Sequence, residues 1–249
     1  MVIGDIALFQ YGLIAAAAMA ASVLGGIAGY GPGLIMPLIL VPLIGAEATV
    51  PVLGVSALFT NAGRVWVFRR HFDRRKAALI AAVALPGCLL GAYGYTLLSG
   101  PVVTILIGGM LAVVVPARRL MVRFRLRLSN RGLAATGAGY GVIVGGTAGS
   151  GVILLSMLMA AGLEGPAVIA TDAGISVGLS MIKTGVFQAA GAMTPSSWMI
   201  ALLIGAATTP GAFIARWLVA RFPANIHTRI LEAAIVTGAV LLIARGLGF

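Results

Sequence analysis

Long apolar runs, separated by short stretches of glycine, proline or charged residues, follow one another along the whole chain. They fall at roughly 6–24, 33–45, 48–68, 77–98 and 101–117 in the first half, and at roughly 132–146, 150–162, 166–190, 196–220 and 227–245 in the second. A helix needs about 20 apolar residues to cross the hydrocarbon layer of a membrane. The pattern therefore predicts an all-α, polytopic membrane protein with five helical segments in each half.

Some of these runs are short for a membrane span. The runs 33–45 and 150–162 are too short to cross, and the run 132–146 is marginal. Both of the shortest runs follow a cluster of glycines, which favours broken or re-entrant helices. Interrupted backbone at membrane depth is tolerated only where it lines a cavity or is buried in protein.

The composition excludes several classes of protein. Hydrophobic residues make up 60% of the 249 residues and charged residues 9%, against roughly 25% charged in soluble domains. Intrinsic disorder requires low hydrophobicity and is excluded as well. The net charge of +11 does not indicate a nucleic-acid partner, because such proteins carry dense basic patches on a polar surface. Residues 1–10 carry only Asp5 as a charge, so we expect no secretory signal and take the chain as mature.

A glycine-rich motif occurs twice at an offset of 120 residues. Residues 25–31 read GGIAGYG and residues 145–151 read GGTAGSG. The same offset pairs Gly54-Val55-Ser56 with Gly174-Ile175-Ser176, and Pro86-Gly87 resembles Pro210-Gly211 at a slightly larger offset. This recurrence predicts an internal duplication, with repeats at 1–120 and 132–249 joined by a connection at 121–131.

Basic residues predict the orientation of the two repeats. They gather after the third run, in the connection between the halves, and around the loop after the ninth run: Arg69, Arg70, Arg74, Arg75 and Lys76; Arg118, Arg119, Arg123, Arg125, Arg127 and Arg131; and Arg216, Arg221 and Arg229. Lys/Arg-rich loops stay cytoplasmic. With all three loops inside, the repeats are inverted and both termini face outward. Inverted repeats with discontinuous helices are typical of secondary transporters, whose substrate site lies near the membrane midplane.

At these residues the sequence resembles the sulfite exporter TauE/SafE family, also called the toluene-sulfonate uptake permease family. The resemblance rests on GGIAGYGPGLIMPLIL at 25–40, its second copy GGTAGSGVILL, and the two Pro-Gly pairs. It covers nearly the whole chain and implies a multi-pass inner-membrane transporter of sulfite or an organosulfonate. The second copy lacks two prolines of the first, since Pro32 and Pro37 correspond to Val152 and Met157.

The candidate substrate-binding residues come first from the two glycine clusters. They are Gly29, Tyr30 and Gly31 in the first copy, and Thr147, Gly149, Ser150 and Gly151 in the second. Free backbone N–H groups at a helix break favour anions, and the hydroxyls add hydrogen bonds. Close helix packing through small residues is the alternative interpretation of the same clusters.

Ionisable residues inside the apolar runs supply the other candidates. Arg64, with Asn61 three residues before it, and Lys183 occupy nearly equivalent positions in the two halves, and together they could neutralise an anion near the centre. Snorkelling toward a membrane surface is the alternative for both cations. Asp172 is a candidate coupling residue that would take up a proton, or else a structural polar contact.

The sequence does not favour an enzyme. His71 and His227 share no metal-ligand spacing with Cys or carboxylates, and no phosphate-binding glycine–lysine motif follows a strand pattern. We therefore expect no catalytic residues, no metal and no cofactor. The expected partners are a small anionic substrate, lipid, protons as a coupling ion and a second copy in a homo-oligomer. A passive anion channel and a non-transporting membrane scaffold subunit are the alternatives.

Overall fold

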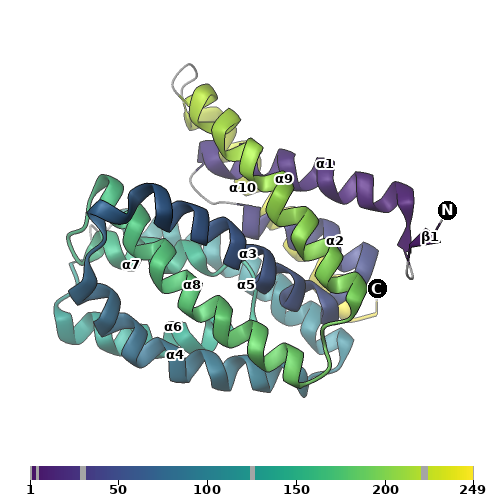
Figure 1. The fold of residues 1–249 in the computed structure, drawn as a ribbon, viewed down its shortest axis with the longest axis horizontal. Helices are drawn as coiled ribbons and strands as arrows, with labels where there is room; N and C mark the ends of the chain where they lie inside the picture. Colours follow the sequence, from purple (N-terminus) through teal and green to yellow (C-terminus); the bar gives the residue numbers. More distant parts are fainter. Residues whose placement is uncertain (1, 4–5, 29–31, 124–126, 220–223, 249) are drawn as a thin grey trace.

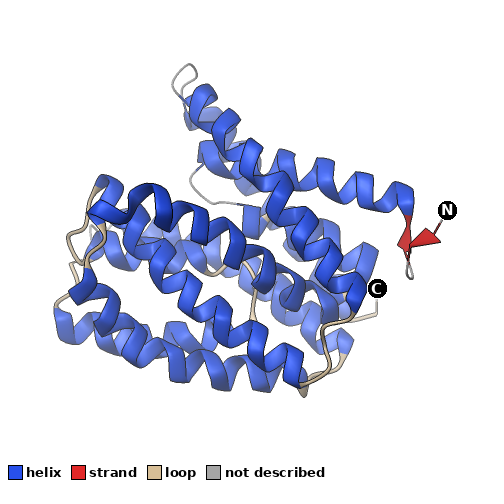
Figure 2. Ribbon diagram, in the orientation of Figure 1, coloured by secondary structure: helices blue, strands red, loops and turns tan. Residues whose placement is uncertain are grey.

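The computed structural model describes residues 2–3, 6–28, 32–123, 127–219 and 224–248, which fold into α-helices apart from one small strand pair (Figures 1 and 2). The first-half helices are α1 (Leu8–Ala28), α2 (Met36–Ile44), α3 (Ala46–Phe68), α4 (Arg74–Thr96) and α5 (Gly100–Arg123). The second-half helices are α6 (Asn130–Gly146), α7 (Gly151–Ala160), α8 (Gly165–Ala189), α9 (Pro195–Val219) and α10 (Ala224–Gly246). Two 3-10 turns, η1 (Pro32–Leu34) and η2 (Arg69–His71), and the antiparallel pair β1 (Val2–Ile3) and β2 (Ile6–Ala7) complete the described elements. The all-helical prediction is confirmed, with that strand pair as the exception.

Each apolar run of the sequence overlaps one α-helix, and the short runs form short helices. Helix α2 has 9 residues, α7 has 10 and α6 has 17. Within the described residues, the segments long and apolar enough to cross a membrane are Ala46–His71, Arg74–Thr96, Gly100–Met121 and Gly165–Ala189.

Local sequence explains where several helices begin. Asp73 caps α4 by accepting a hydrogen bond from the Lys76 backbone N–H at 2.9 Å. Ser129 caps α6 in the same way through Gly132, at 3.3 Å. Such caps satisfy backbone donors that have no partner within the helix. Gly45 joins α2 to α3 with a φ of +84°, a conformation that glycine adopts without steric cost.

Helices α4 and α6 pack closely along each other because glycines line their interface. A Cβ on Gly87 of α4 would lie 2.8 Å from the Ala138 carbonyl oxygen of α6. A Cβ on Gly145 of α6 would lie 2.7 Å from the Ala92 nitrogen of α4. Neither position has room for a larger side chain, so small residues permit the close backbone contact that stabilises membrane helix pairs.

The remaining major helix pairs are α1 with α9, α5 with α10, and α3 with α8. Helices α3 and α8 lie side by side across the middle of the molecule, with α4 and α6 beneath them in the same view (Figure 1). The α1–α9 contact also uses a glycine, since a Cβ on Gly211 would lie 2.7 Å from the Ser22 Cβ. Ser22 donates a hydrogen bond to the Thr208 carbonyl oxygen at 2.8 Å across this interface.

Helices α6 and α7 form a hairpin whose turn lies inside the protein. The residues of this turn, Thr147–Ser150, include buried side chains at both ends. At the opposite end of the hairpin, the Leu128 N–H just before α6 donates to the Ala160 carbonyl oxygen at the end of α7, at 2.8 Å. The chain therefore enters and leaves this hairpin at the same end of the molecule.

Candidate functional site

The central pair α3 and α8 carries both of the intramembrane cations predicted from the sequence. The helices run antiparallel, because Gly54 of α3 faces Lys183 of α8 while Arg64 of α3 faces Asp172 of α8. Gly54 and Arg64 are ten residues apart, which corresponds to about 15 Å along a helix. The two cations therefore lie at different levels of the helix pair, and the structure does not bring them together around one small anion.

Lys183 is buried, with 6% of its surface exposed. Its Nζ donates a hydrogen bond to the Thr147 carbonyl oxygen at 3.1 Å. A Cβ added to Gly54 would lie 3.6 Å from the Lys183 Cε, an ordinary van der Waals distance, so the lysine stem packs along α3 at this level. A snorkelling lysine would reach the surface with its ammonium, so this burial argues against that alternative.

The turn between α6 and α7 interrupts the helix as the second glycine cluster predicts. Helix α6 ends at Gly146 and α7 begins at Gly151, and Gly149 between them has a φ of +81°. Gly151 has open space around it, whereas Thr147 and Ser150 are buried. The alternative of close packing holds at the start of the same motif, where Gly145 contacts α4. One cluster thus contains both packing glycines and a helix break.

The two helix breaks touch each other. A Cβ on Gly33 in η1 would lie 3.7 Å from the Gly149 Cα, and a Cβ on Gly149 would overlap the Leu34 side chain. Gly29, Tyr30 and Gly31 of the first copy lie outside the described residues. The contact at Gly33 nevertheless brings the segment just after them against Gly149 of the second break, two residues from Thr147, whose carbonyl accepts the hydrogen bond of Lys183.

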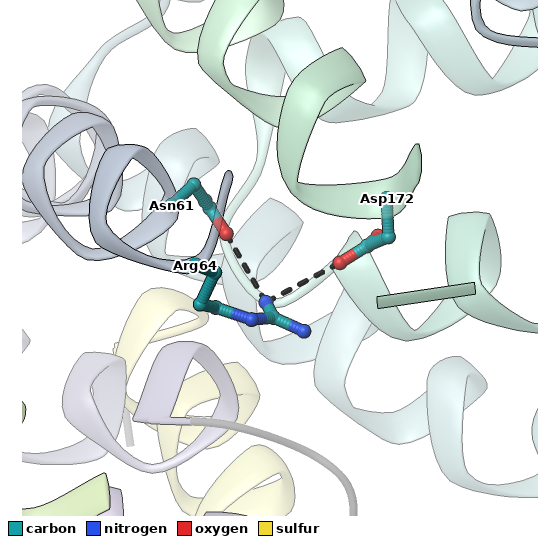
Figure 3. Close-up of polar contacts among 3 residues, drawn as sticks. All are labelled: Asn61, Arg64 and Asp172. Atoms are coloured by element: carbon teal, nitrogen blue, oxygen red, sulfur yellow. Dashed lines mark hydrogen bonds and ion pairs between the residues drawn. The ribbon is translucent and has the colours of Figure 1, made fainter. Parts of the chain in front are cut away.

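Arg64 forms an ion pair that the sequence does not predict. Its Nη1 lies 3.3 Å from Asp172 Oδ2 and donates a second hydrogen bond to Asn61 Oδ1 at 3.1 Å (Figure 3). The Asp172 side chain is 7% exposed and that of Arg64 is 38% exposed. Asp172 Oδ1 is buried and has no hydrogen-bond partner among the described residues. Tyr140 of α6 is also buried and lies near Asp172.

Asn61 and Arg64, three residues apart, lie on one face of α3, whereas the acidic partner of Arg64 is 108 residues away in the chain. The hydrogen bond from Lys183 to the Thr147 carbonyl could not be predicted from the sequence either, because every residue has a backbone carbonyl. Thr184 also has a buried hydroxyl without a hydrogen-bond partner among the described residues, directly after Lys183.

A cleft of about 710 Å³ opens where α3 begins and α8 ends. Its lining includes Leu43, Ile44, Glu47, Tyr95, Thr96, Ala192, Thr194, Ser197 and Ile200. The Tyr95 hydroxyl donates to the Ala46 carbonyl oxygen at 2.7 Å, and its ring meets the buried Phe187 ring edge to face at 5.5 Å between centroids. Phe187 is one helical turn beyond Lys183, so this aromatic pair lies between the cleft and the level of the buried ammonium.

The described part of the chain contains no group of three or more His, Cys, Asp or Glu residues arranged to hold a metal ion. The polar groups around the helix breaks are instead a cation, hydroxyls and backbone amides. This set of groups suits the binding of an anion.

Comparison with known proteins gives one match. Searches of curated proteins and of solved structures each found no match to the chain. The family model described as Sulfite exporter TauE/SafE matches residues 14–242, which is nearly the whole chain and includes both glycine clusters. The protein is a multi-pass membrane protein of the transporter class, and it belongs to the sulfite exporter TauE/SafE family.

Proposed function

We propose that this protein is a secondary transporter that moves a small sulfur-containing anion, sulfite or an organosulfonate, across the inner membrane by alternating access. The observation that carries the proposal is the buried Lys183 ammonium beside two touching helix breaks. An intramembrane cation is costly to bury and marks a functional site by default. Family membership supports the class of substrate.

An inverted duplication of residues 1–120 and 132–249, joined by 121–131, supports the alternating-access mechanism. If each helix of the first half corresponds to the helix five places later, the α1–α9 pair maps onto the α6–α4 pair. The α3–α8 and α5–α10 pairs each map onto themselves. The close contact of Gly211 in α9 with Ser22 in α1 corresponds in the same way to the contact of Gly87 in α4 with Val142 in α6. A two-fold relation of this kind gives inward- and outward-open states of similar energy.

The binding site that we propose lies where the two breaks meet. Lys183 supplies the charge, Ser150 supplies a hydroxyl, and Thr147, Gly149 and Gly151 supply backbone groups from the second break. The Thr147 hydroxyl already donates to the Ile143 carbonyl oxygen at 2.6 Å. Gly29, Tyr30 and Gly31 would complete it from the first break, by analogy with the repeated motif. The Lys183 ammonium has three N–H donors, of which the Thr147 carbonyl takes one, so donors remain for anion oxygens.

The Arg64–Asp172 pair, with Asn61, is the proposed coupling element. Asp172 is buried, its Oδ2 pairs with Arg64, and its Oδ1 has no partner among the described residues. Protonation of this carboxylate would release Arg64 and loosen the end of the α3–α8 contact. Asp172 would thereby link proton uptake to opening at that end.

The orientation that we propose places the basic loops in the cytoplasm and both termini outside. The basic segment after α3 and the basic connection before α6 both adjoin the region where α8 begins. Thr171 of α8 accepts a hydrogen bond from the Asp73 N–H at 3.1 Å, and Leu128 bonds Ala160, five residues before α8. Their location at one end fits the rule that basic loops stay inside. Residues 220–223, in the third basic loop, lie outside the described residues.

The test replaces the buried lysine and compares it with the other lysine of the chain. Lys183→Met should lower anion transport roughly tenfold to a hundredfold, because a hydrogen bond to a charged group contributes about 1.5–3 kcal/mol. Lys76→Met is the matched control, since Lys76 forms only a local pair with Asp73 at 3.7 Å in the first turn of α4. Both variants are reconstituted in liposomes at equal protein amounts. Normal transport by Lys183→Met would refute the assigned role.

Counterflow of labelled sulfite or methanesulfonate separates this mechanism from the two alternatives. A carrier exchanges labelled for unlabelled anion and saturates. A passive channel would conduct without counterflow, and a scaffold subunit would show neither transport nor stabilisation by an anion.

A further inference from the structure

The proposed site contains one positive charge that no carboxylate balances. The chain has six acidic residues, of which Asp5 lies outside the described residues. The others have positions away from Lys183: Asp73 caps α4, Glu232 pairs with Arg119, Asp172 pairs with Arg64, Glu164 is exposed before α8, and Glu47 is exposed at the cleft. Among the residues that the structure describes, no ion pair includes Lys183.

Arg64 does not add a second charge to this site. Its guanidinium is matched by the Asp172 carboxylate at 3.3 Å, so the pair is neutral as a unit. It also lies about 15 Å along α3 from the level of Lys183. Among the residues that the structure describes, one buried cation without an acidic partner and one distant neutral pair therefore define the charge available to a ligand.

We propose that the site is selective for anions with a single negative charge. The class comprises sulfonates R–SO₃⁻ and hydrogen sulfite, with sulfate, thiosulfate and divalent sulfite as disfavoured ligands. This inference rests on the proposed function and names its substrate class. A monovalent anion balances the Lys183 ammonium, whereas a divalent anion leaves one negative charge uncompensated in a buried environment, which is strongly unfavourable.

Methanesulfonate and sulfate form the matched pair of probes for this selectivity. Both are tetrahedral sulfur oxyanions of similar size. Methanesulfonate carries a methyl group at the position where sulfate carries a second charged oxygen. Their dissociation constants are measured by calorimetry on the purified full chain in lipid nanodiscs. We expect sulfate to bind roughly tenfold or more weakly than methanesulfonate, because its second charge has no partner in the buried site.

Two variants assign the selectivity to Lys183. Lys183→Arg keeps one cation and should keep the preference for methanesulfonate over sulfate. Lys183→Met removes the cation and should weaken methanesulfonate binding about tenfold or more. A thermal unfolding curve for each variant separates a lost charge from a lost fold. Retention of methanesulfonate binding by a folded Lys183→Met protein would overturn the assignment.

If neither probe binds, sulfite itself provides the comparison, since it passes from hydrogen sulfite to the divalent form as the pH rises through neutrality. Lys183→Arg removes the titration of the lysine. Cys88→Ala on α4 removes the buried thiol near it. Asp172→Asn, made together with Arg64→Gln, removes the titratable carboxyl near Tyr140 and its charge partner as a neutral unit. Weaker binding at higher pH in this background supports the proposal.

The outcomes for the charge class and for transport are distinguishable. Equal or tighter binding of sulfate, or of divalent sulfite, overturns the monovalent selectivity but leaves anion transport standing. Binding of none of these anions overturns both the selectivity and the proposed function.

Discussion

Two glycines of α6, two residues apart, have opposite surroundings and allow a matched test of the helix packing. A Cβ on Gly141 would overlap the Ala84 carbonyl oxygen of α4 and lie 2.8 Å from the Ala84 Cα. A Cβ on Gly139 would meet no atom within 4 Å. Gly141→Ala and Gly139→Ala therefore add the same methyl group to the same helix, in one case against backbone and in the other in open space.

The expected magnitudes follow from these contacts. An alanine favours a helix over glycine by about 0.8–1.0 kcal/mol, and both variants gain this term. Overpacking costs about 1–3 kcal/mol where the neighbour must move, and only Gly141→Ala incurs it. Because the obstacle is the backbone of α4 and not a flexible side chain, the two helices would have to separate. We expect Gly141→Ala to be less stable than Gly139→Ala by about 1–3 kcal/mol.

The single cysteine of the chain supplies the assay. Cys88 is buried on α4, and its carbonyl group lies against Gly145 of α6 in the same interface. A thiol-reactive fluorogenic dye therefore reports when α4 and α6 separate during heating. Gly141→Ala should react at a lower temperature than the unchanged protein, and Gly139→Ala at the same or a higher one. If Gly141→Ala reacts at the same temperature as Gly139→Ala or above it, the close α4–α6 contact is refuted.

Three further substitutions test the site and its surroundings. Asp172→Asn removes the charge partner of Arg64 and should destabilise the protein by about 1–3 kcal/mol. This is less than the cost of breaking a fully buried ion pair, because Arg64 is partly exposed. The same variant should lose the response of transport to an imposed pH gradient in liposomes, and an unchanged response would contradict the coupling role. Gly149→Ala should destabilise the protein by about 1–2 kcal/mol, because residue 149 has a left-handed backbone conformation. It should also reduce anion transport, because the added Cβ has no room beside Leu34 at the other helix break. Full transport by this variant would argue against a binding site at the breaks. Tyr95→Phe leaves the Ala46 carbonyl without the tyrosine hydroxyl and should cost about 1 kcal/mol in the thermal assay, whereas an unchanged melting curve would show that this hydrogen bond contributes nothing.

The positions of the helices could be predicted from the sequence because a membrane severely restricts the backbone. Every polar backbone group in lipid must be hydrogen-bonded within the protein, and a helix achieves this within one segment, so each long apolar run of this chain corresponds to a helix. Helices α2 and α7 were predicted as short, and each has ten residues or fewer. The glycine clusters likewise predict interruptions of the helices, and the break at residues 147–150 is present.

The roles of individual glycines could not be separated in the same way. Gly145 and Gly149 belong to one motif, yet the first contacts α4 and the second has a positive φ in a turn. Glycine suits both situations, because the absence of a Cβ permits close approach as well as left-handed backbone. Only the neighbouring helix and the local backbone conformation distinguish them.

The sequence by itself determined the helical class, the ten apolar segments, the repeated motif and the presence of rare ionisable residues among them. Those properties depend on hydrophobicity and on local backbone chemistry, which are readable in linear order. The tertiary structure alone decided which charges are balanced. Arg64 and Lys183 look equivalent in the chain, but the antiparallel packing of α3 on α8 brings Asp172 to Arg64 and leaves Lys183 with the Thr147 carbonyl. Charge balance depends on distances of a few ångströms between residues far apart in sequence, and only the packed helices fix those distances.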